Sequence, residues 1–319
     1  RRPPRSTLFP YTTLFRSSEN TTSKNLITLG KIAYNWLLQS SRAVVWGNTS
    51  TGLFLNIQSD QIIFLTSSDH IGPVNIIIRN QFPSHWANKD KIQIIHQDNE
   101  FTLFNQQDKL QITIDNIWHT PIKPPGRISP DEQRCRLLQS ANQISLLKNG
   151  QGFAPLLIPF LRNEPPEDLE DAWLSQSWDK IIHLKQSLLN KDIGKVFSVS
   201  KQLVGSGRGL TPSGDDLLTG LFFMHKRWFK NTGWMDEMEQ SLVHEFQQHT
   251  TAVSSTLFWC ALHGEADARI QELSDALMTS EIPFHQQAIQ LARWGNSSGA
   301  DVFLGMLLAI ASFQNQSEG

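Results

Sequence analysis

Leu203-Val-Gly-Ser-Gly-Arg-Gly-Leu-Thr-Pro-Ser-Gly-Asp-Asp-Leu-Leu-Thr-Gly220 joins a glycine-rich loop to the start of an apolar helix. A second stretch, Ser298-Gly-Ala-Asp-Val-Phe-Leu-Gly-Met306, repeats the pattern of residues 213–221 with Ser, Gly, Asp and Gly in register. Gly220 and Gly305 each lie one helical turn beyond the matched aspartate, on the same helix face. We therefore expect two helices that cross at these glycines and bring their loop-to-helix junctions into one site.

The sequence on either side of this segment predicts a β part followed by a helical part. Short β-branched or aromatic runs, separated by turn residues, occur at 43–46, 53–57, 62–65, 74–78, 92–95, 101–104 and 110–114. Such spacing is typical of an antiparallel β sandwich or small barrel. Helical periodicity then predicts helices near 131–148, 168–189, 191–203, 214–229, 234–248, 251–263, 266–278, 284–294 and 299–314. Strands followed by helices indicate an α+β chain with segregated parts.

The chain divides into three segments. Residues 1–17 read as the in-frame translation of a sequencing adapter, so the native chain is expected to begin near Ser18. Residues 18–125 are predicted to form the β-rich domain, with a leading amphipathic helix over residues 25–39. The proline-rich stretch at 121–126 is a natural connector. Residues 126–319 are expected to form the helical domain that carries both junctions.

The composition is that of a folded cytoplasmic protein. Because 28 Lys and Arg nearly cancel 30 Asp and Glu, the net charge does not indicate nucleic acid or an anionic membrane as a partner. The hydrophobic content of 39% argues against disorder. Cys135 and Cys260 lie in unrelated segments without metal-ligand spacing, so free thiols in a reducing compartment are expected. The longest apolar run, residues 302–313, is shorter than the roughly 20 residues that span a bilayer.

The glycine-rich loop predicts an anion-binding site. Glycines adopt positive φ readily and let backbone amides approach a bound group. If a helix begins at Ser213, the free amides of its first turn add partial positive charge, and Arg208 adds a full one. A phosphate or carboxylate would fit there, but no Walker or Rossmann pattern indicates a nucleotide. The predicted anion-binding residues are Gly205, Gly207, Arg208, Gly209, Thr211, Ser213, Gly214, Ser298 and Gly299.

Helix capping offers a structural alternative for part of this pattern. Ser213-x-x-Asp216 and Ser298-x-x-Asp301 both match the capping box, which would stabilise each helix by about 1 kcal/mol without any ligand. Thr211-Pro212 offers a rival helix start with Thr as the cap. Neither alternative explains Asp215, Arg208 or the three alternating glycines.

Three aspartates are candidate catalytic residues: Asp215, Asp216 and Asp301. Asp215 could act as a general base or orient an amide group. Asp215 and Asp216 could also hold Mg²⁺, which binds through a few carboxylates and water, although a capping acid needs no ion. No GxSxG or Cys/His pairing supports nucleophilic catalysis.

The segment between the junctions is rich in hydroxyl groups. Thr250, Thr251 and Ser254 could donate hydrogen bonds to a small polar substrate. They could equally cap a helix and bond to its backbone. Both interpretations stay open at this stage.

The Gly-x-Gly-x-Gly-Leu-Thr-Pro-Ser-Gly-Asp-Asp motif, together with the later Ser-Ser-Gly-Ala-Asp, resembles the AllH-like (PucX-like) family of oxamate carbamoyltransferase subunits. The resemblance covers most of the chain after residue 25. It implies a transferase of purine and allantoin breakdown that converts oxalurate and phosphate to oxamate and carbamoyl phosphate, together with FdrA-like and other partner subunits.

The resemblance also implies roles for residues. The loop of Gly205, Gly207 and Gly209, with Arg208, would bind phosphate or carbamoyl phosphate. The three candidate aspartates would orient the carbamoyl nitrogen or bind a cation. The chain lacks the Ser-Thr-Arg-Thr phosphate loop of aspartate and ornithine carbamoyltransferases. Because the family name does not say which subunit holds the chemistry, a non-catalytic metabolite-binding or assembly subunit is the alternative.

Overall fold

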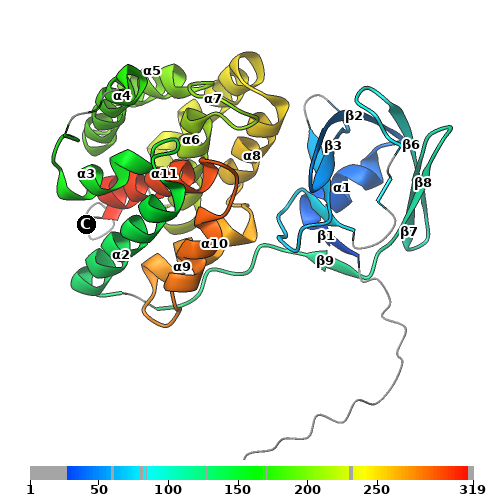
Figure 1. Ribbon diagram of the computed structural model, residues 1–319, viewed down its shortest axis with the longest axis horizontal. Helices are drawn as coiled ribbons and strands as arrows, with labels where there is room; N and C mark the ends of the chain where they lie inside the picture. The colour runs from blue at the N-terminus through cyan, green and yellow to red at the C-terminus, as the bar shows by residue number, and fades with distance from the viewer. Residues whose placement is uncertain are drawn as a thin grey trace, which may run out of the picture.

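The computed structural model describes residues 27–58, 61–78, 82–83, 85–126, 128–167, 169, 171–229 and 233–314. Within them a curled β sheet is followed by an assembly of helices that lies beside it (Figure 1). The predicted fold class is therefore confirmed. The prediction for residues 1–17 lies outside the described part of the chain.

In the described residues, nine strands form one sheet in the order β8-β7-β6-β2-β3-β4-β5-β1-β9. Their bounds are β1 (Thr28–Gly30), β2 (Arg42–Thr49), β3 (Gly52–Asn56), β4 (Ile62–Thr66), β5 (Asn75–Ile77), β6 (Lys91–Gln97), β7 (Glu100–Phe104), β8 (Lys109–Thr113) and β9 (Asn116–Trp118). Each β-rich run predicted from the sequence overlaps one of the strands β2 to β8, whereas β1 and β9 were not expected. Most neighbours pair antiparallel, but β4 with β5 and β1 with β9 pair parallel.

Helix α1 (Lys31–Gln39) lies within the curl of the sheet (Figure 1). It begins later than expected because residues 28–30 extend as β1 and pair with β5 and β9. Alternate side chains of a strand point to one face of the sheet. The core on the α1 side contains Leu37 of the helix and, from one face of β3 and β4, Leu53, Leu55, Ile63 and Leu65, each at most 1% exposed.

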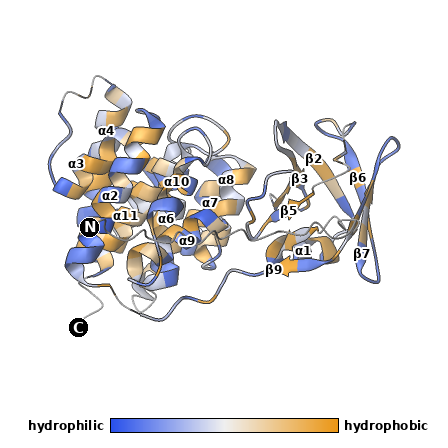
Figure 2. Cartoon of the chain, turned by 60° about the horizontal axis from the view of Figure 1, so that its bottom comes forward, coloured by the Kyte–Doolittle hydropathy of each residue, from blue (hydrophilic) through white to orange (hydrophobic). Residues whose placement is uncertain are grey.

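The helical part contains all the helices predicted after residue 126. Their bounds are α2 (Pro130–Lys148), α3 (Leu157–Arg162), α4 (Ala172–Leu189), α5 (Ile193–Leu203), α6 (Ser213–Trp228), α7 (Asp236–His249), α8 (Ala252–Leu262), α9 (Ala268–Met278), α10 (His285–Ala292) and α11 (Ser298–Phe313). Short α3 and two 3₁₀ turns, η1 (Ala154–Leu156) and η2 (Gly233–Met235), were not predicted. Figure 2 shows both polar and apolar residues along outer helices such as α3 and α4, which suits one buried and one solvated face.

The buried helices α6 and α11 cross at the two matched glycines. A Cβ on Gly220 would come 2.1 Å from the carbonyl oxygen of Val302, and one on Gly305 would come 1.9 Å from that of Leu217. Only glycine permits so close an approach of two backbones. The predicted crossing is therefore present. The contacts are also reciprocal, since Val302 and Leu217 occupy matched positions of the repeat.

Helix α8 joins the helical part to the sheet. The amide of Ile62 on β4 donates to Thr256 Oγ1 at 3.0 Å, and Cys260 is buried in the same apolar cluster as the strands. On its other side, Phe258 belongs to the helical core. A second link runs from the amide of Ala268, at the start of α9, to the carbonyl oxygen of Ile71 at 3.0 Å. A helix buried on two sides is expected to carry no charged side chain, and α8 has none.

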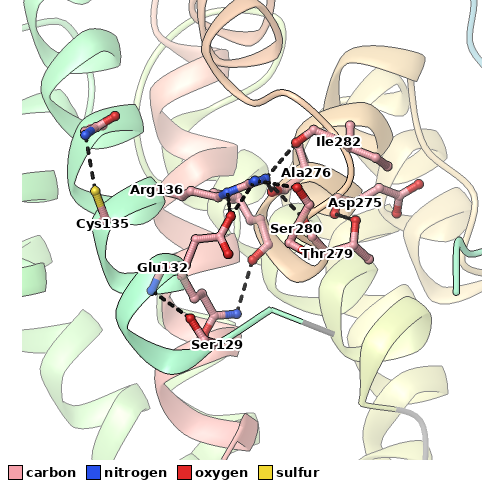
Figure 3. A network of polar contacts seen from close by, with 12 residues as sticks. Ser129, Glu132, Cys135, Arg136, Asp275, Ala276, Thr279, Ser280 and Ile282 are labelled. Atoms are coloured by element: carbon pink, nitrogen blue, oxygen red, sulfur yellow. Dashed lines mark hydrogen bonds and ion pairs between the residues drawn. The ribbon is translucent and has the colours of Figure 1, made fainter. Parts of the chain in front are cut away.

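The guanidinium of Arg136 closes the end of α9 (Figure 3). It donates to the carbonyl oxygens of Ala276, Thr279, Ser280 and Ile282 at 2.6–3.0 Å. The last carbonyls of a helix have no partner within the helix, so an outside donor must satisfy them. The side chain of Arg136 thus ties α2 to the segment that follows α9.

Candidate functional site

A cavity of about 580 Å³ lies between the sheet and the helical part. This volume falls within the range of small-molecule binding sites. The sheet side is formed by β3, β4 and residues 66–75, and the helical side by residues 208–211, α8, the start of α9 and residues 293–298. Both junctions identified in the sequence therefore reach the same cavity.

The charged lining of the cavity is mainly basic. Among the described residues it includes three arginines, Arg208, Arg269 and Arg293, and a single acid, Asp267. Asp267 is already paired, because both of its carboxylate oxygens accept from the Arg269 guanidinium, at 2.7 and 2.9 Å. The side chains of Arg208 and Arg293 form no ion pair with any residue that the structure describes. Two cations are thus left to attract an anion into the cavity.

His70 lines the same cavity from the sheet side. Partial burial lowers the pKa of its imidazole, and the positive charge of Arg269 lowers it further. The ring is therefore neutral near pH 7 and carries one nitrogen that can accept a proton.

The loop that carries Arg208, residues 204–212, is fixed by groups behind it. Gly207 and Gly209 have φ values of 121° and 98°, which other residues rarely adopt. The hydroxyl of Thr251 donates to the carbonyl oxygen of Leu210 at 2.6 Å. Because the loop is held at several points, the arginine projects from a defined backbone.

The loop that carries Arg293, residues 293–297, is held in a different way. Lys148 Nζ donates to the carbonyl oxygens of Trp294 and Gly295, at 3.1 and 2.7 Å. The ring of Trp294 lies against the guanidinium of Arg269, 5.2 Å from its centre. The buried Lys148 of α2 therefore holds the backbone of the loop that carries Arg293.

The internal repeat extends further towards the N-terminus than residues 213–221 and 298–306. Arg208 lies five residues before Ser213, and Arg293 lies five residues before Ser298. The two arginines are thus equivalent positions of the repeat, 85 residues apart. This match was the signal that could have identified Arg293, whereas Arg269, Asp267 and His70 have no such signal.

Four of the predicted binding residues line the cavity: Arg208, Gly209, Thr211 and Ser298. The hydroxyl oxygens of Thr211 and Ser298 lie 3.0 Å apart, so they connect the two junctions directly. The other predicted binding residues lie behind the lining: Gly205, Gly207, Ser213, Gly214, Thr250, Thr251, Ser254 and Gly299. Their predicted role in binding stays a prediction.

The amides at the start of α6 are occupied by the protein itself. The amide of Gly214 donates to the carbonyl oxygen of Ser206 at 2.8 Å, and a Cβ on Gly207 would come 2.7 Å from the amide nitrogen of Ser213. The amide of Gly205 donates to Asp215 Oδ1 at 2.7 Å. The glycines therefore allow the loop to fold tightly over the helix end, which differs from an open anion nest.

The predicted capping boxes are wrong. Helices α6 and α11 begin at Ser213 and Ser298, which are already helical, and the residues that precede them, Pro212 and Ser297, make no side-chain cap. The rival start with Thr211 as the cap is also wrong, since the cap position is Pro212. The serine hydroxyls instead act across the helix pair. Ser298 lowers the pKa of Asp216 on the other helix, and Ser213 does the same for Asp301.

The three candidate aspartates are at most 2% exposed and do not line the cavity. Asp215 accepts hydrogen bonds from the amide of Gly205 and the hydroxyl of Thr250, so it ties the loop to the start of α8. Burial raises its pKa. Thr250 therefore serves as an internal partner of Asp215.

Asp216 and Asp301 face each other where α6 and α11 begin. Burial raises the pKa of Asp216 well above its ordinary range, and the negative charge of Asp301 adds to the rise. Burial also raises the pKa of Asp301 to about 6, although the amide of Phe153 donates to its Oδ1 at 2.6 Å. The Oδ2 atoms of both accept no hydrogen bond from any described residue. Near pH 7 the pair therefore favours sharing a proton over carrying two charges.

No group of three His, Cys, Asp or Glu side chains in the described residues is arranged to hold a metal ion. The predicted Mg²⁺ site at Asp215 and Asp216 stays a prediction. In the same residues, no helix has the length and apolar character needed to cross a membrane.

Comparison with known proteins gives one match. Residues 203–310 match the family model described as oxamate carbamoyltransferase subunit AllH. This range contains both junctions and the three arginines of the cavity, and it confirms the resemblance inferred from the motifs over these residues. The predicted extension of the resemblance to residues before 203 stays a prediction. No curated protein and no solved structure matches the chain.

Proposed function

Since residues 203–310 match the AllH family of oxamate carbamoyltransferase subunits, we propose that this chain is a subunit of such a complex and binds its anionic reactants between sheet and helices. The observation that carries the proposal is the pair of arginines, Arg208 and Arg293, which line one cavity without an acidic partner in the described residues. A guanidinium binds phosphate or carboxylate through two parallel hydrogen bonds.

The proposed reaction has two anionic reactants. An oxygen of phosphate attacks the carbamoyl carbon of oxalurate, and the bond from that carbon to the oxamoyl nitrogen breaks. The proton of the phosphate passes to the departing nitrogen, which gives oxamate and carbamoyl phosphate. Two arginines on separate loops suit this chemistry, because together they can offset the negative charge of the phosphate and of the oxalurate carboxylate. Bringing two negatively charged reactants together costs free energy, and such a site mainly lowers this cost.

The buried aspartates support the site from behind. Asp215 holds the Arg208 loop through the amide of Gly205, and Asp301 holds the amide of Phe153 beside the Arg293 loop. We therefore propose that they position the arginines. Their predicted direct role on the carbamoyl nitrogen stays a prediction, which Asp215→Asn tests in the reconstituted complex. Wild-type turnover by this variant would remove Asp215 from the mechanism.

Isothermal titration of the purified chain with phosphate, carbamoyl phosphate and oxamate tests the binding proposal. We expect each anion to bind, with a loss of roughly tenfold in affinity in Arg208→Ala and in Arg293→Ala, since each removes a charge-assisted contact of about 1.4 kcal/mol or more. Arg134→Ala on α2 is the matched control, because Arg134 is exposed and lies outside the cavity lining. Absence of binding, or equal losses in all three variants, would contradict the proposal.

A non-catalytic metabolite-binding or assembly role is the second candidate. One observation favours it: the only carboxylate of the described cavity lining, Asp267, is paired with Arg269. His70 is then the remaining candidate for proton transfer. Reconstitution with FdrA-like and other partner subunits separates the two roles. Turnover lost in His70→Asn with anion binding retained indicates catalysis in this chain, whereas unchanged turnover indicates that the chemistry lies in a partner.

A further inference from the structure

The strands that line the cavity are apolar on both faces. The residues on one face of β3 and β4 pack against α1, and the alternate residues Phe54, Ile62 and Phe64 line the cavity. Phe54 and Phe64 are paired across the two strands, and their rings stack with centres 4.5 Å apart. Both rings remain partly exposed although the helical part lies over this face. A strand covered by protein on both faces would be expected to bury such rings fully.

Helix α8 and the first loop continue this apolar surface. Val253 and Leu257 of α8 line the cavity, and Leu210 beside them is 44% exposed. We define the apolar wall as Phe54, Phe64, Leu210, Val253 and Leu257. The arginines come from the loops and from the start of α9, so the cavity combines an apolar wall with a cationic lining.

Phosphate fills only a small part of this space. The cavity holds about 580 Å³, whereas phosphate displaces only a few waters at ~30 Å³ each. A ligand that covers exposed apolar surface inside a cavity removes this surface from water, which makes binding more favourable. A small hydrophilic anion would leave the apolar wall hydrated.

We infer that the cavity accepts an anion that carries an aromatic or similarly flat apolar ring. The anionic group lies at Arg208 and Arg293, and the ring lies on the stacked pair of Phe54 and Phe64. Only the anionic end of this ligand rests on the proposed function. The position of its ring rests on the apolar wall. Ring-to-ring contact adds stacking to the hydrophobic gain.

Titration with two phosphate esters of equal charge, methyl phosphate and phenyl phosphate, tests the inference. We expect phenyl phosphate to bind at least tenfold more tightly than methyl phosphate. Phe64→Leu should reduce this ratio to threefold or less, because Leu keeps an apolar side chain in the strand but removes the flat ring. Phe104→Leu is the matched control, since Phe104 is a partly exposed strand residue outside the cavity lining, and it should keep the wild-type ratio.

The outcomes separate this inference from the proposed function. Equal affinities for the two esters, together with binding of phosphate, would overturn the inference and leave the proposed function intact. Binding of phenyl phosphate that Arg208→Ala and Arg293→Ala do not weaken would contradict the anion site and keep the apolar one. A wild-type ratio in Phe64→Leu, or an equal fall of the ratio in Phe64→Leu and Phe104→Leu, would overturn the inference, because the ring would then not depend on the stacked pair. Thermal unfolding of each variant confirms that it is folded before titration.

Discussion

Gly220 and Gly305 each lie against the backbone of the other's helix, Gly220 beside the carbonyl oxygen of Val302 and Gly305 beside that of Leu217. Helices α6 and α11, whose preceding loops line the candidate site, are thereby fixed to each other about one turn from Asp216 and Asp301. The positions of the two arginine-bearing loops therefore depend on a contact between two backbones.

Replacing Gly305 by Ala is expected to destabilise the protein by about 2–4 kcal/mol, because the new methyl group would lie 1.9 Å from a backbone oxygen. Gly220→Ala should have a similar effect. Chemical denaturation measures the loss as a lower midpoint at constant slope. Gly194→Ala on α5 is the control, since the nearest atom to its Cβ is 3.7 Å away, and it should be neutral or stabilise by up to about 1 kcal/mol. Equal effects at Gly194 and Gly305 would contradict the close crossing.

Arg136→Lys should destabilise the protein by about 1–3 kcal/mol, and Arg136→Ala by more. A lysine cannot reproduce the planar set of donors that satisfies four carbonyl oxygens at the end of α9 (Figure 3). Thermal unfolding measures the change, and Arg134→Lys, an exposed neighbour on the same helix, is expected to unfold like the wild type. An unchanged midpoint of thermal unfolding in Arg136→Lys would show that one ammonium group is enough to satisfy these carbonyl oxygens.

Asp301 should make the protein less stable as the pH rises. Its folded-state pKa of about 6 lies above the ordinary value near 3.8. Between those values the folded protein holds a proton that the unfolded chain has released, so its stability falls by up to about 3 kcal/mol from pH 4 to pH 6. Asp301→Asn keeps an oxygen acceptor for the Phe153 amide but removes the titration.

The free energy of unfolding, measured from pH 4 to pH 7, should therefore fall less steeply in Asp301→Asn than in the wild type. Relative to the wild type, the free energy of unfolding of the variant should increase by about 2–3 kcal/mol between pH 4 and pH 7. Parallel curves for the two proteins would show that Asp301 does not hold a raised pKa in the folded state.

Asp267→Asn should strengthen anion binding by roughly threefold to tenfold, because it releases Arg269 from its only acidic partner among the cavity residues. Asn still caps α9, since its side-chain oxygen can accept from the amide of Arg269 as Asp267 does. Asp171→Asn is the control, because Asp171 caps α4 in the same way outside the cavity. Phosphate titration at low and at 0.5 M salt should show the gain mainly at low salt.

The sequence predicted the elements well where their periodicity is strong. Helices α6 and α11 were expected within one residue of their bounds, and their glycines predicted the crossing, because a missing Cβ at matched helical positions lets two helix backbones approach closely. The start of α1 was missed because residues 28–30 join the sheet through partners far along the chain. Such pairing leaves no local signal.

The site was predicted only in part, for a similar reason. Arg208 lies within an obvious motif, and Arg293 lies at the matching place of the repeat. Arg269, His70 and the apolar wall meet them only because α9 and the sheet fold against the loops. The expectation that Ser213 and Ser298 cap their helices was wrong because each serine faces the opposite helix, which depends on tertiary structure.

The reciprocal contacts of α6 and α11 place the two arginines at equivalent positions of the repeat, and two equivalent cations do not by themselves distinguish the two ends of a ligand. The orientation of a ligand in the cavity must then be set by parts that the repeat does not duplicate. These are the Asp267–Arg269 pair and the strands with Phe54 and Phe64. Under the proposed function, the loops before the paired helices would bind the anionic groups, and these unrepeated parts of the cavity would set the orientation of the ligand.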